Sequence, residues 1–292
     1  MAATEVIALF GPTASGKTAV AEEVADRLGT EVVSADAFQV YRGLELLTAQ
    51  PERPTRLVGI RDVGDVMSVG EYAPLAHAAI DELVAAHGTA IVAGGTGLYL
   101  RAALTELALP PAPAPGARER WEAVYDEDPE TAFRRLRELD PAAAERVHAR
   151  DRRRVVRALE LAEAGASLVP ASDRLWSGDY RRPTLVLGLE LPPETLEARI
   201  RARAERMLAR GAAQEARRAL PHASPTAGKA LGLRELAELP PGEALERLVL
   251  RTRRYAAYQR KWMRRIPGIV MIDADRPAAE VADAILEVAR AR

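Results

Sequence analysis

Short apolar runs alternate with longer amphipathic stretches along the chain, a pattern typical of strands that alternate with helices. Val6–Phe10 is apolar and ends at a glycine, and a helical pattern follows over Lys17–Leu28. A second apolar run leads into Asp36, and a third covers residues 89–93. We therefore predict buried parallel strands joined by helices, with the carboxyl ends of the strands together at one edge of a sheet.

The same alternation continues along the rest of the chain. Ser68 and Glu71 have the spacing of a capping box and predict a helix that runs toward His87. Helical patterns also continue to Arg265. The remaining predicted elements are strands at 184–191 and 269–272 and helices at 192–210 and 277–292.

A proline-rich stretch at 109–116 interrupts this alternation. The following residues are helical by pattern, with helix starts at Asp128 and Asp140, each followed by proline. We predict an α/β fold in which a mainly helical subdomain, residues 110–183, is inserted into a core made of residues 1–109 and 184–292.

Composition narrows the possible functions. The chain has 292 residues, no cysteine and a net charge of −1, so disulfides and cysteine-ligated metal sites are excluded and a wholly basic nucleic-acid binder is disfavoured. The four histidines lie far apart in sequence, which argues against a histidine metal cluster. No apolar run approaches membrane-spanning length. We expect a monomeric cytoplasmic protein with no membrane contact.

The strongest chemical signal is a complete G-x-x-x-x-G-K-[ST] pattern between the first predicted strand and helix. Such a loop cradles phosphate with its backbone N–H groups, while the lysine contacts anionic oxygens and the hydroxyl residue can hold Mg²⁺. The alternative is a chance glycine-rich turn, which the flanking strand and helix disfavour. The predicted diphosphate-binding residues are Gly11, Pro12, Thr13, Ala14, Ser15, Gly16, Lys17 and Thr18, with Thr18 as the metal ligand.

The motif makes the core a P-loop NTPase-like parallel sheet, but it does not identify the phosphate compound. A nucleotide hydrolase would place an acidic magnesium ligand after an apolar strand, whereas the strand at 89–93 ends in Gly94-Gly95-Thr96. Asp36 is the remaining acid at a strand end near the loop. It suits a general base for a second substrate, and the alternative is an ordinary turn residue.

Several segments resemble the bacterial tRNA dimethylallyltransferases, also called isopentenyltransferases. The resemblance covers nearly the whole chain in the family's order. Its segments are GPTASGKT at 11–18, SADAFQVYRGLELLTAQP at 34–51, GGTGLY at 94–99, DRRRVVRALEL at 151–161, RMLARG at 206–211, ALGLREL at 230–236 and RTRRYAAYQRKWMRR at 251–265.

The resemblance implies transfer of a dimethylallyl group from its diphosphate to the exocyclic amine of the adenosine next to the anticodon in tRNA. Lys17 and Thr18 with Mg²⁺ would stabilise the leaving diphosphate, and Asp36 would accept the proton of the amine. In the family, residues corresponding to Asp36, Ala37, Phe38 and Gln39 contact the modified base. The anticodon stem-loop and dimethylallyl diphosphate are the implied partners.

Further candidate site residues follow from their positions on the predicted loops and helices. Thr13 and Thr96 lie on loops that should border the same cleft, although turn chemistry alone would explain either. Arg199 and Arg203 are one helical turn apart and could clamp the diphosphate, and we favour Arg203. The catalytic candidates are therefore Asp36, Lys17, Thr13, Thr96 and Arg203.

Arginines cluster at 150–157, at 181 and 182, and at 251–265. The long runs at 150–157 and 251–265 suggest a polynucleotide acceptor, although a charge run is often only a solvated face. In the run at 251–265, Arg251, Tyr255, Tyr258 and Trp262 share one helix face, which we expect to be packed. The opposite face would be free for phosphate. The predicted tRNA-backbone contacts are Arg153, Arg157, Arg253 and Arg260.

The chain also departs from the family pattern. Ala37 stands where a serine is usual, Gln50 where a lysine is usual, and the region 56–62 replaces a usual histidine pair. Three other functions stay open: prenylation of free adenine nucleotides, a P-loop small-molecule kinase, and a nucleotide-gated RNA-binding module. The long insertion and the arginine-rich helices favour the tRNA acceptor.

Overall fold

The computed structural model describes residues 4–107, 113–169 and 178–291. The chain divides into two compact units, one made of Met1–Glu106 with Leu175–Arg292 and the other of Leu107–Arg174. The first unit is the α/β core and the second is helical.

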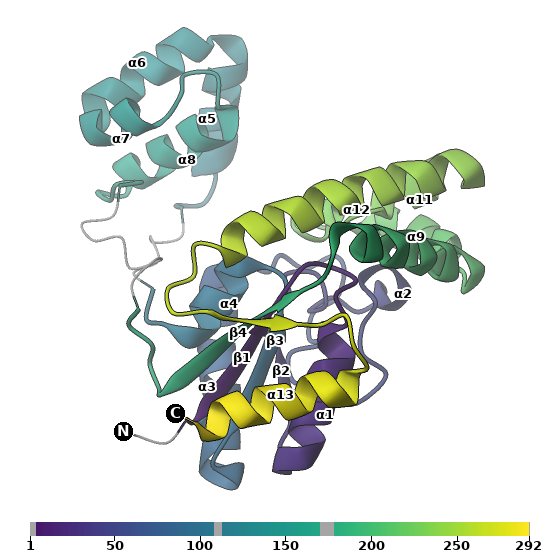
Figure 1. Cartoon of the computed structure of the whole chain (residues 1–292). Helices are drawn as coiled ribbons and strands as arrows, with labels where there is room; N and C mark the ends of the chain where they lie inside the picture. Colours follow the sequence, from purple (N-terminus) through teal and green to yellow (C-terminus); the bar gives the residue numbers. More distant parts are fainter. Residues whose placement is uncertain (1–3, 108–112, 170–177, 292) are drawn as a thin grey trace. The chain divides into compact units, whose positions relative to one another are not determined.

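A five-stranded parallel sheet forms the centre of the core, with the strand order β2-β3-β1-β4-β5 (Figure 1). This confirms the predicted fold class. β3 begins and ends one residue later than its apolar run suggested. The strands are β1 Val6–Phe10, β2 Val32–Ser34, β3 Ala90–Gly94, β4 Thr184–Glu190 and β5 Val270–Asp273.

The central strands are buried on both faces, which explains why they read as continuous apolar runs. Every residue of β1 is buried, and β4 is buried over 185–189. Helices α1 (Lys17–Leu28) and α13 (Ala278–Arg290) pack together on one face, and α3 (Val69–His87) and α4 (Gly97–Leu104) on the other (Figure 1). Ser68 and Glu71 form the predicted capping box at the start of α3.

Further helices gather beyond the carboxyl edge of the sheet, where α12 packs on α9 and α11 (Figure 1). The longest of them, α12, lies next to the P-loop, as the contacts described below show. These elements are α2 Glu45–Thr48, α9 Pro193–Ala209, α10 Ala212–Ala219, η2 Leu220–His222, η3 Ala227–Lys229, α11 Leu233–Glu238 and α12 Pro241–Met263.

The helical unit consists of α5 (Ala117–Glu127), α6 (Pro129–Leu139), α7 (Pro141–Arg146) and α8 (Arg152–Glu163). Asp128 and Asp140 cap α6 and α7 through their side chains, as the Asp-Pro pairs predicted. The unit has its own apolar core. Its buried members include Tyr125, Leu136, Val155, Val156 and Leu159.

The end of the insertion differs from our sequence-based boundary at residue 183. The helical unit ends at Arg174, and the residues just before β4 lie with the core. Arg181 N–H donates to Leu104 O at 2.9 Å. The guanidinium groups of Arg181 and Arg182 both pair with Asp81 on α3. These contacts fix the entry into β4, and the two clustered arginines are ion-paired with residues of the α/β core.

Candidate active site

The P-loop joins the end of β1 to the start of α1, as the motif predicts. Gly16 has a φ of 88°, a left-handed conformation that an L side chain would strain. Ala14 has a φ of 65°, so it holds a similar conformation despite its Cβ. Lys17 Nζ donates to Pro12 O at 2.7 Å, and Thr18 lies exposed in the first turn of α1. The loop therefore offers a helix N-terminus, a lysine and, at the next position, an exposed hydroxyl.

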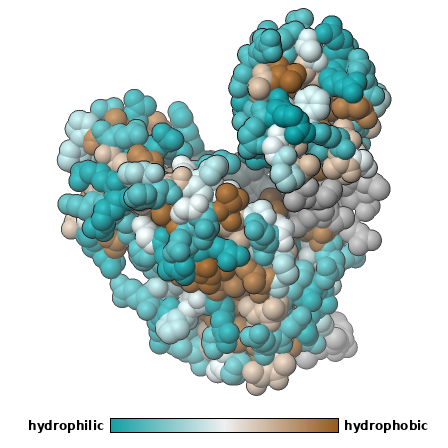
Figure 2. Space-filling model, turned by 180° about the vertical axis from the view of Figure 1, so that it is seen from behind, coloured by the Kyte–Doolittle hydropathy of each residue, from teal (hydrophilic) through white to brown (hydrophobic). Residues whose placement is uncertain are grey.

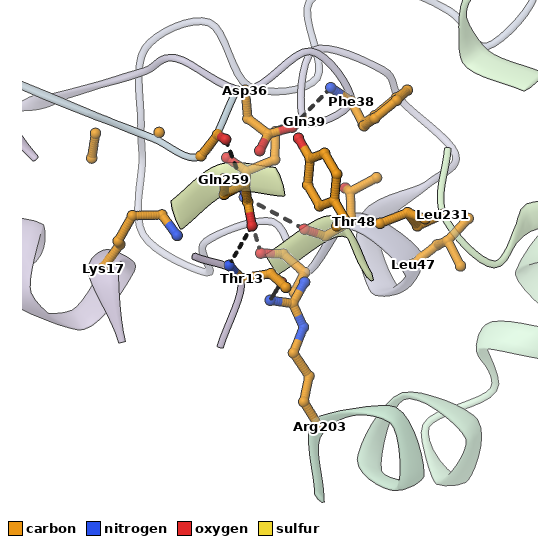
Figure 3. A pocket seen from close by; sticks show the side chains of 15 residues that line it. Thr13, Lys17, Asp36, Phe38, Gln39, Leu47, Thr48, Arg203, Leu231 and Gln259 are labelled. Carbon is orange, nitrogen blue, oxygen red and sulfur yellow. Dashed lines mark hydrogen bonds between the residues drawn. The ribbon is translucent and has the colours of Figure 1, made fainter. Parts of the chain in front are cut away.

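A cleft at the carboxyl edge of the sheet brings together several of the predicted residues (Figure 3). Thr13, Lys17 and Arg203 line one side of it. Asp36, Phe38 and Gln39 come from the segment after β2, and Leu47 and Leu231 add an apolar wall. A second hollow, lined by Ala14 and Gly16 of the P-loop, shares Lys17 and Arg203 and is also lined by Arg199 and Arg206. Cations thus lie where the two hollows adjoin.

Lys17 has unusual electrostatics for a lysine. Burial disfavours its ammonium form and lowers its pKa to about 7. The carboxylate of Asp36 acts in the opposite direction, while the positive charge of Arg203 lowers the pKa further. Burial also lowers the pKa of Arg203. Two cations and one carboxylate thus share the cleft, an arrangement that suits an anionic ligand.

Asp36 is the one acidic residue among those that line the cleft. The preceding residue extends the sheet, because Ala35 N–H donates to Ala93 O at 2.8 Å. Asp36 Oδ1 accepts a hydrogen bond from Phe38 N–H at 2.9 Å. The second carboxylate oxygen remains for another donor, and the charge of Asp36 is felt by both Lys17 and Arg203.

The two arginines of α9 take different partners. Arg203 Nη1 donates to Thr13 Oγ1 at 2.9 Å inside the cleft, whereas Arg199 pairs with Asp275 at 3.1 Å. Thr96 is not among the residues that line the cleft. Its hydroxyl lies 3.4 Å from Ala37 N and 3.3 Å from Tyr255 Oη, so it supports the segment that carries Asp36.

The amide of Gln39 is already bonded within the protein. Oε1 accepts from Ser34 Oγ at 2.8 Å, and Nε2 donates to Ala49 O at 3.2 Å. These bonds hold the turn after α2 against the cleft. A contact between Gln39 and adenine stays a prediction, and it would require this amide to exchange partners.

The predicted RNA-binding arginines are distributed over both units. In the helical unit, Arg153 is exposed and Arg157 pairs with the buried Glu160 at 3.0 Å. In the core, Arg253 pairs with Glu197 on α9, and Arg260 lies 3.6 Å from Glu190. Their contact with tRNA stays a prediction, and three of the four would have to share or exchange a carboxylate partner.

In the described parts of the chain, no helix is long and apolar enough to cross a membrane. Hydrophilic side chains cover most of the face shown in Figure 2, and hydrophobic ones form smaller areas. The monomeric state and the cytoplasmic location stay predictions.

Comparison with known proteins decides the family. The family model described as IPP transferase matches residues 39–266, and the model described as isopentenyl transferase matches residues 4–61, which include the P-loop. The chain belongs to the IPP transferase family. This confirms the resemblance seen in its sequence segments.

Relatives of this IPP transferase match it over most of its length. A tRNA dimethylallyltransferase of Anaeromyxobacter dehalogenans is 40% identical over 91% of this chain and 94% of its own, and one of Nocardioides sp. is 38% identical over 94% and 93%. Among solved structures, the tRNA isopentenylpyrophosphate transferase of Bacillus halodurans has a TM-score of 0.68 and 28% identity, covering 98% of this chain and 97% of its own.

Our sequence reasoning missed part of the IPP transferase cleft. Gln259 and Tyr255 of α12 line it, as do residues 47–49 and Leu231. The helix face of Arg251, Tyr255, Tyr258 and Trp262 is not buried as we expected, because Arg251 is exposed and Tyr258 is 55% exposed. Within that face, the rings of Tyr258 and Trp262 meet edge to face. The buried stripe instead contains Ala256, Gln259 and Met263. A polar residue in an otherwise apolar stripe was the signal that could have identified Gln259.

Proposed function

We propose that this protein transfers a dimethylallyl group from dimethylallyl diphosphate to the N6 amine of the adenosine on the 3′ side of the anticodon in tRNA. Diphosphate is the second product. The observation that carries this proposal is that one carboxylate, Asp36, and two cations, Lys17 and Arg203, line a single cleft. The names of the relatives support the choice of donor and acceptor.

The donor site must stabilise charge on the leaving diphosphate. Lys17, Arg203 and the N-terminus of α1 provide positive potential on the same side of the cleft. When Lys17 releases Pro12 O, its Nζ becomes free to bind a diphosphate oxygen. The guanidinium of Arg203 remains bonded to the hydroxyl of Thr13.

Mg²⁺ fits this site as a companion of the diphosphate. In the described residues, no group of three or more histidine or acidic side chains could hold a metal by itself. Thr18 offers a hydroxyl in the first turn of α1, and the remaining ligands would be phosphate and water oxygens, which suit Mg²⁺. When bound, the ion would neutralise charge on the diphosphate.

The acceptor reaction needs a proton acceptor. The adenine amine forms a bond to C1 of the dimethylallyl group as the bond from C1 to the diphosphate oxygen breaks, and the amine loses one proton. Asp36 faces the cleft between the cations and the apolar wall, and it is the acid available to take that proton. Leu47 and Leu231 provide apolar surface for the hydrocarbon.

The acceptor base must leave its stack to enter such a cleft, which costs least in a single-stranded loop. The anticodon loop meets that condition. Phe38 and Gln39 line the cleft next to Asp36, and together with the adjacent Ala37 they would border the base. The arginines at 153, 157, 253 and 260 would bind the RNA backbone.

The experiment that tests this function uses purified protein, Mg²⁺ and dimethylallyl diphosphate labelled in its prenyl group. Unmodified tRNA, AMP and ATP are offered as acceptors in parallel reactions. We expect label in tRNA at one adenosine, located by nuclease digestion and mass spectrometry. Label in AMP or ATP and not in tRNA would overturn the choice of acceptor, and no transfer to any of them would overturn the proposed reaction.

A further inference from the structure

Two glycines of the β3–α4 turn make close packing contacts with helix α12. A methyl group built on Gly95 would overlap the amide nitrogen of Gln259, and one built on Gly97 would overlap the indole ring of Trp262. Gln259 and Trp262 are three residues apart on α12, so they face the turn together. The Gly-Gly-Thr-Gly sequence therefore allows α12 to pack closely against this turn. Phosphate binding alone would not require such close packing.

Gln259 occupies the centre of that contact. Its Oε1 accepts a hydrogen bond from Thr13 N–H at 2.8 Å, and its Nε2 donates to Gly95 O at 2.8 Å. The residue is 2% exposed. One amide thus joins the P-loop, the turn after β3 and α12, and Figure 3 shows it lying between Lys17, Asp36 and Thr13.

The bond to Thr13 affects how the P-loop presents its other groups. An ordinary phosphate cradle uses backbone N–H groups of the loop for the anion, but here the N–H of Thr13 is engaged by Gln259. With its backbone fixed, Thr13 holds its hydroxyl against Arg203 Nη1 at 2.9 Å. The position of the Arg203 guanidinium therefore depends on Gln259 through Thr13.

The bond to Gly95 extends the same linkage toward the acceptor side. The next residue, Thr96, lies within 3.4 Å of Ala37 N through its hydroxyl, and Tyr255 of α12 lies within 3.3 Å of that hydroxyl. Donor-side and acceptor-side loops are thus tied to one buried amide.

We propose that Gln259 is a positioning residue that holds Thr13 and Arg203 in register with the diphosphate and aligns the donor with Asp36. The inference rests on the proposed function and deepens it. Gln259 touches no substrate atom in this scheme, so its loss changes donor binding and turnover and leaves the tRNA-binding surface intact.

The test compares Gln259→Met with wild type. Methionine has similar length and no hydrogen-bonding amide, so both bonds are lost with little change in volume. Since both bonds are lost, we expect roughly a tenfold rise in KM for dimethylallyl diphosphate together with a lower kcat. KM for tRNA should stay within about twofold.

Thr30→Val is the matched structural control. Thr30 Oγ1 donates to Thr89 O at 2.6 Å at the opposite edge of the sheet, so this variant also loses a side-chain to backbone bond. It should lower the melting temperature and leave both KM values unchanged. If Gln259→Met behaved like Thr30→Val, or raised KM for tRNA alone, the positioning role would be overturned.

Gln259→Glu provides a pH-dependent readout that a structural role would not give. A protonated glutamic acid can accept from Thr13 N–H and donate to Gly95 O, whereas a carboxylate repels the carbonyl. The donor KM of Gln259→Glu, divided by that of wild type, should therefore fall as the pH falls. The same ratio for Gln259→Met should not change, and equal pH dependence of the two variants would contradict the mechanism.

Calorimetric binding of inorganic diphosphate separates this inference from the proposed function. Wild type should bind diphosphate more tightly than Gln259→Met even if no acceptor is prenylated, in which case the proposed function fails and the role of Gln259 stands. Equal diphosphate affinity in the two proteins, with wild type active in transfer, would overturn the inference alone.

Discussion

Binding of the donor should draw a proton onto Lys17. In the free protein, burial holds the pKa of Lys17 at about 7, with Asp36 raising it and Arg203 lowering it. A bound diphosphate places negative charge beside the amine and raises the pKa back toward the ordinary value of a lysine. The ammonium form of Lys17 is therefore the form that binds the donor. Above pH 7, where most of the free protein carries a neutral Lys17, binding requires the uptake of a proton.

The size of the effect follows from these values. With a pKa of about 7 in the free protein, roughly one lysine in ten is protonated at pH 8 and roughly nine in ten at pH 6. Donor binding should then take up roughly 0.9 proton at pH 8 and roughly 0.1 at pH 6. Above pH 7 the donor affinity should fall by up to about tenfold per pH unit.

Isothermal titration calorimetry in buffers of different ionisation enthalpy measures this uptake directly. Lys17→Ala, titrated at concentrations high enough to offset its weaker binding, gives the contribution of the donor's own phosphate group. The difference between the two proteins is the share of Lys17. Equal proton uptake at pH 8 in wild type and Lys17→Ala would refute the reasoning, because the amine would then already be charged in the free cleft.

Three further predictions test the general base, the RNA contacts and the packing of α12 against the β3–α4 turn. Asp36→Asn should lower kcat by about 10²- to 10⁴-fold while tRNA affinity changes no more than a few-fold, so near wild-type turnover would exclude Asp36 as the base. Arg153→Gln and Arg253→Gln should each flatten the log–log salt dependence of tRNA binding by roughly 0.7 to 0.9, and filter binding at several salt concentrations would detect an unchanged slope. Gly97→Ala should destabilise the protein by about 1–3 kcal/mol in denaturant unfolding, and less in a Trp262→Leu background. Additive losses in that double-mutant cycle would contradict the close contact.

The amino-acid sequence by itself determined the features that depend on neighbouring residues. Continuous apolar runs marked the strands, because both faces of the central strands are buried. The P-loop could be recognised because its glycines, lysine and hydroxyl act from consecutive positions between β1 and α1. The strand-end position of Asp36 followed from the same local pattern, since parallel strands end at one edge.

The tertiary structure decided which side chains meet. Gln259 reaches Thr13 across 246 positions of sequence, and Arg203 reaches the same residue across 190, so no local period could indicate either contact. The sequence left Arg199 and Arg203 equivalent by spacing, and only packing gave one of them Asp275 and the other the cleft. Likewise, the sequence showed Arg181 and Arg182 only as neighbouring charges, and the fold placed Asp81 beside both of them. Charge pairing and close approach depend on distances in space, which the order of residues along the chain does not specify.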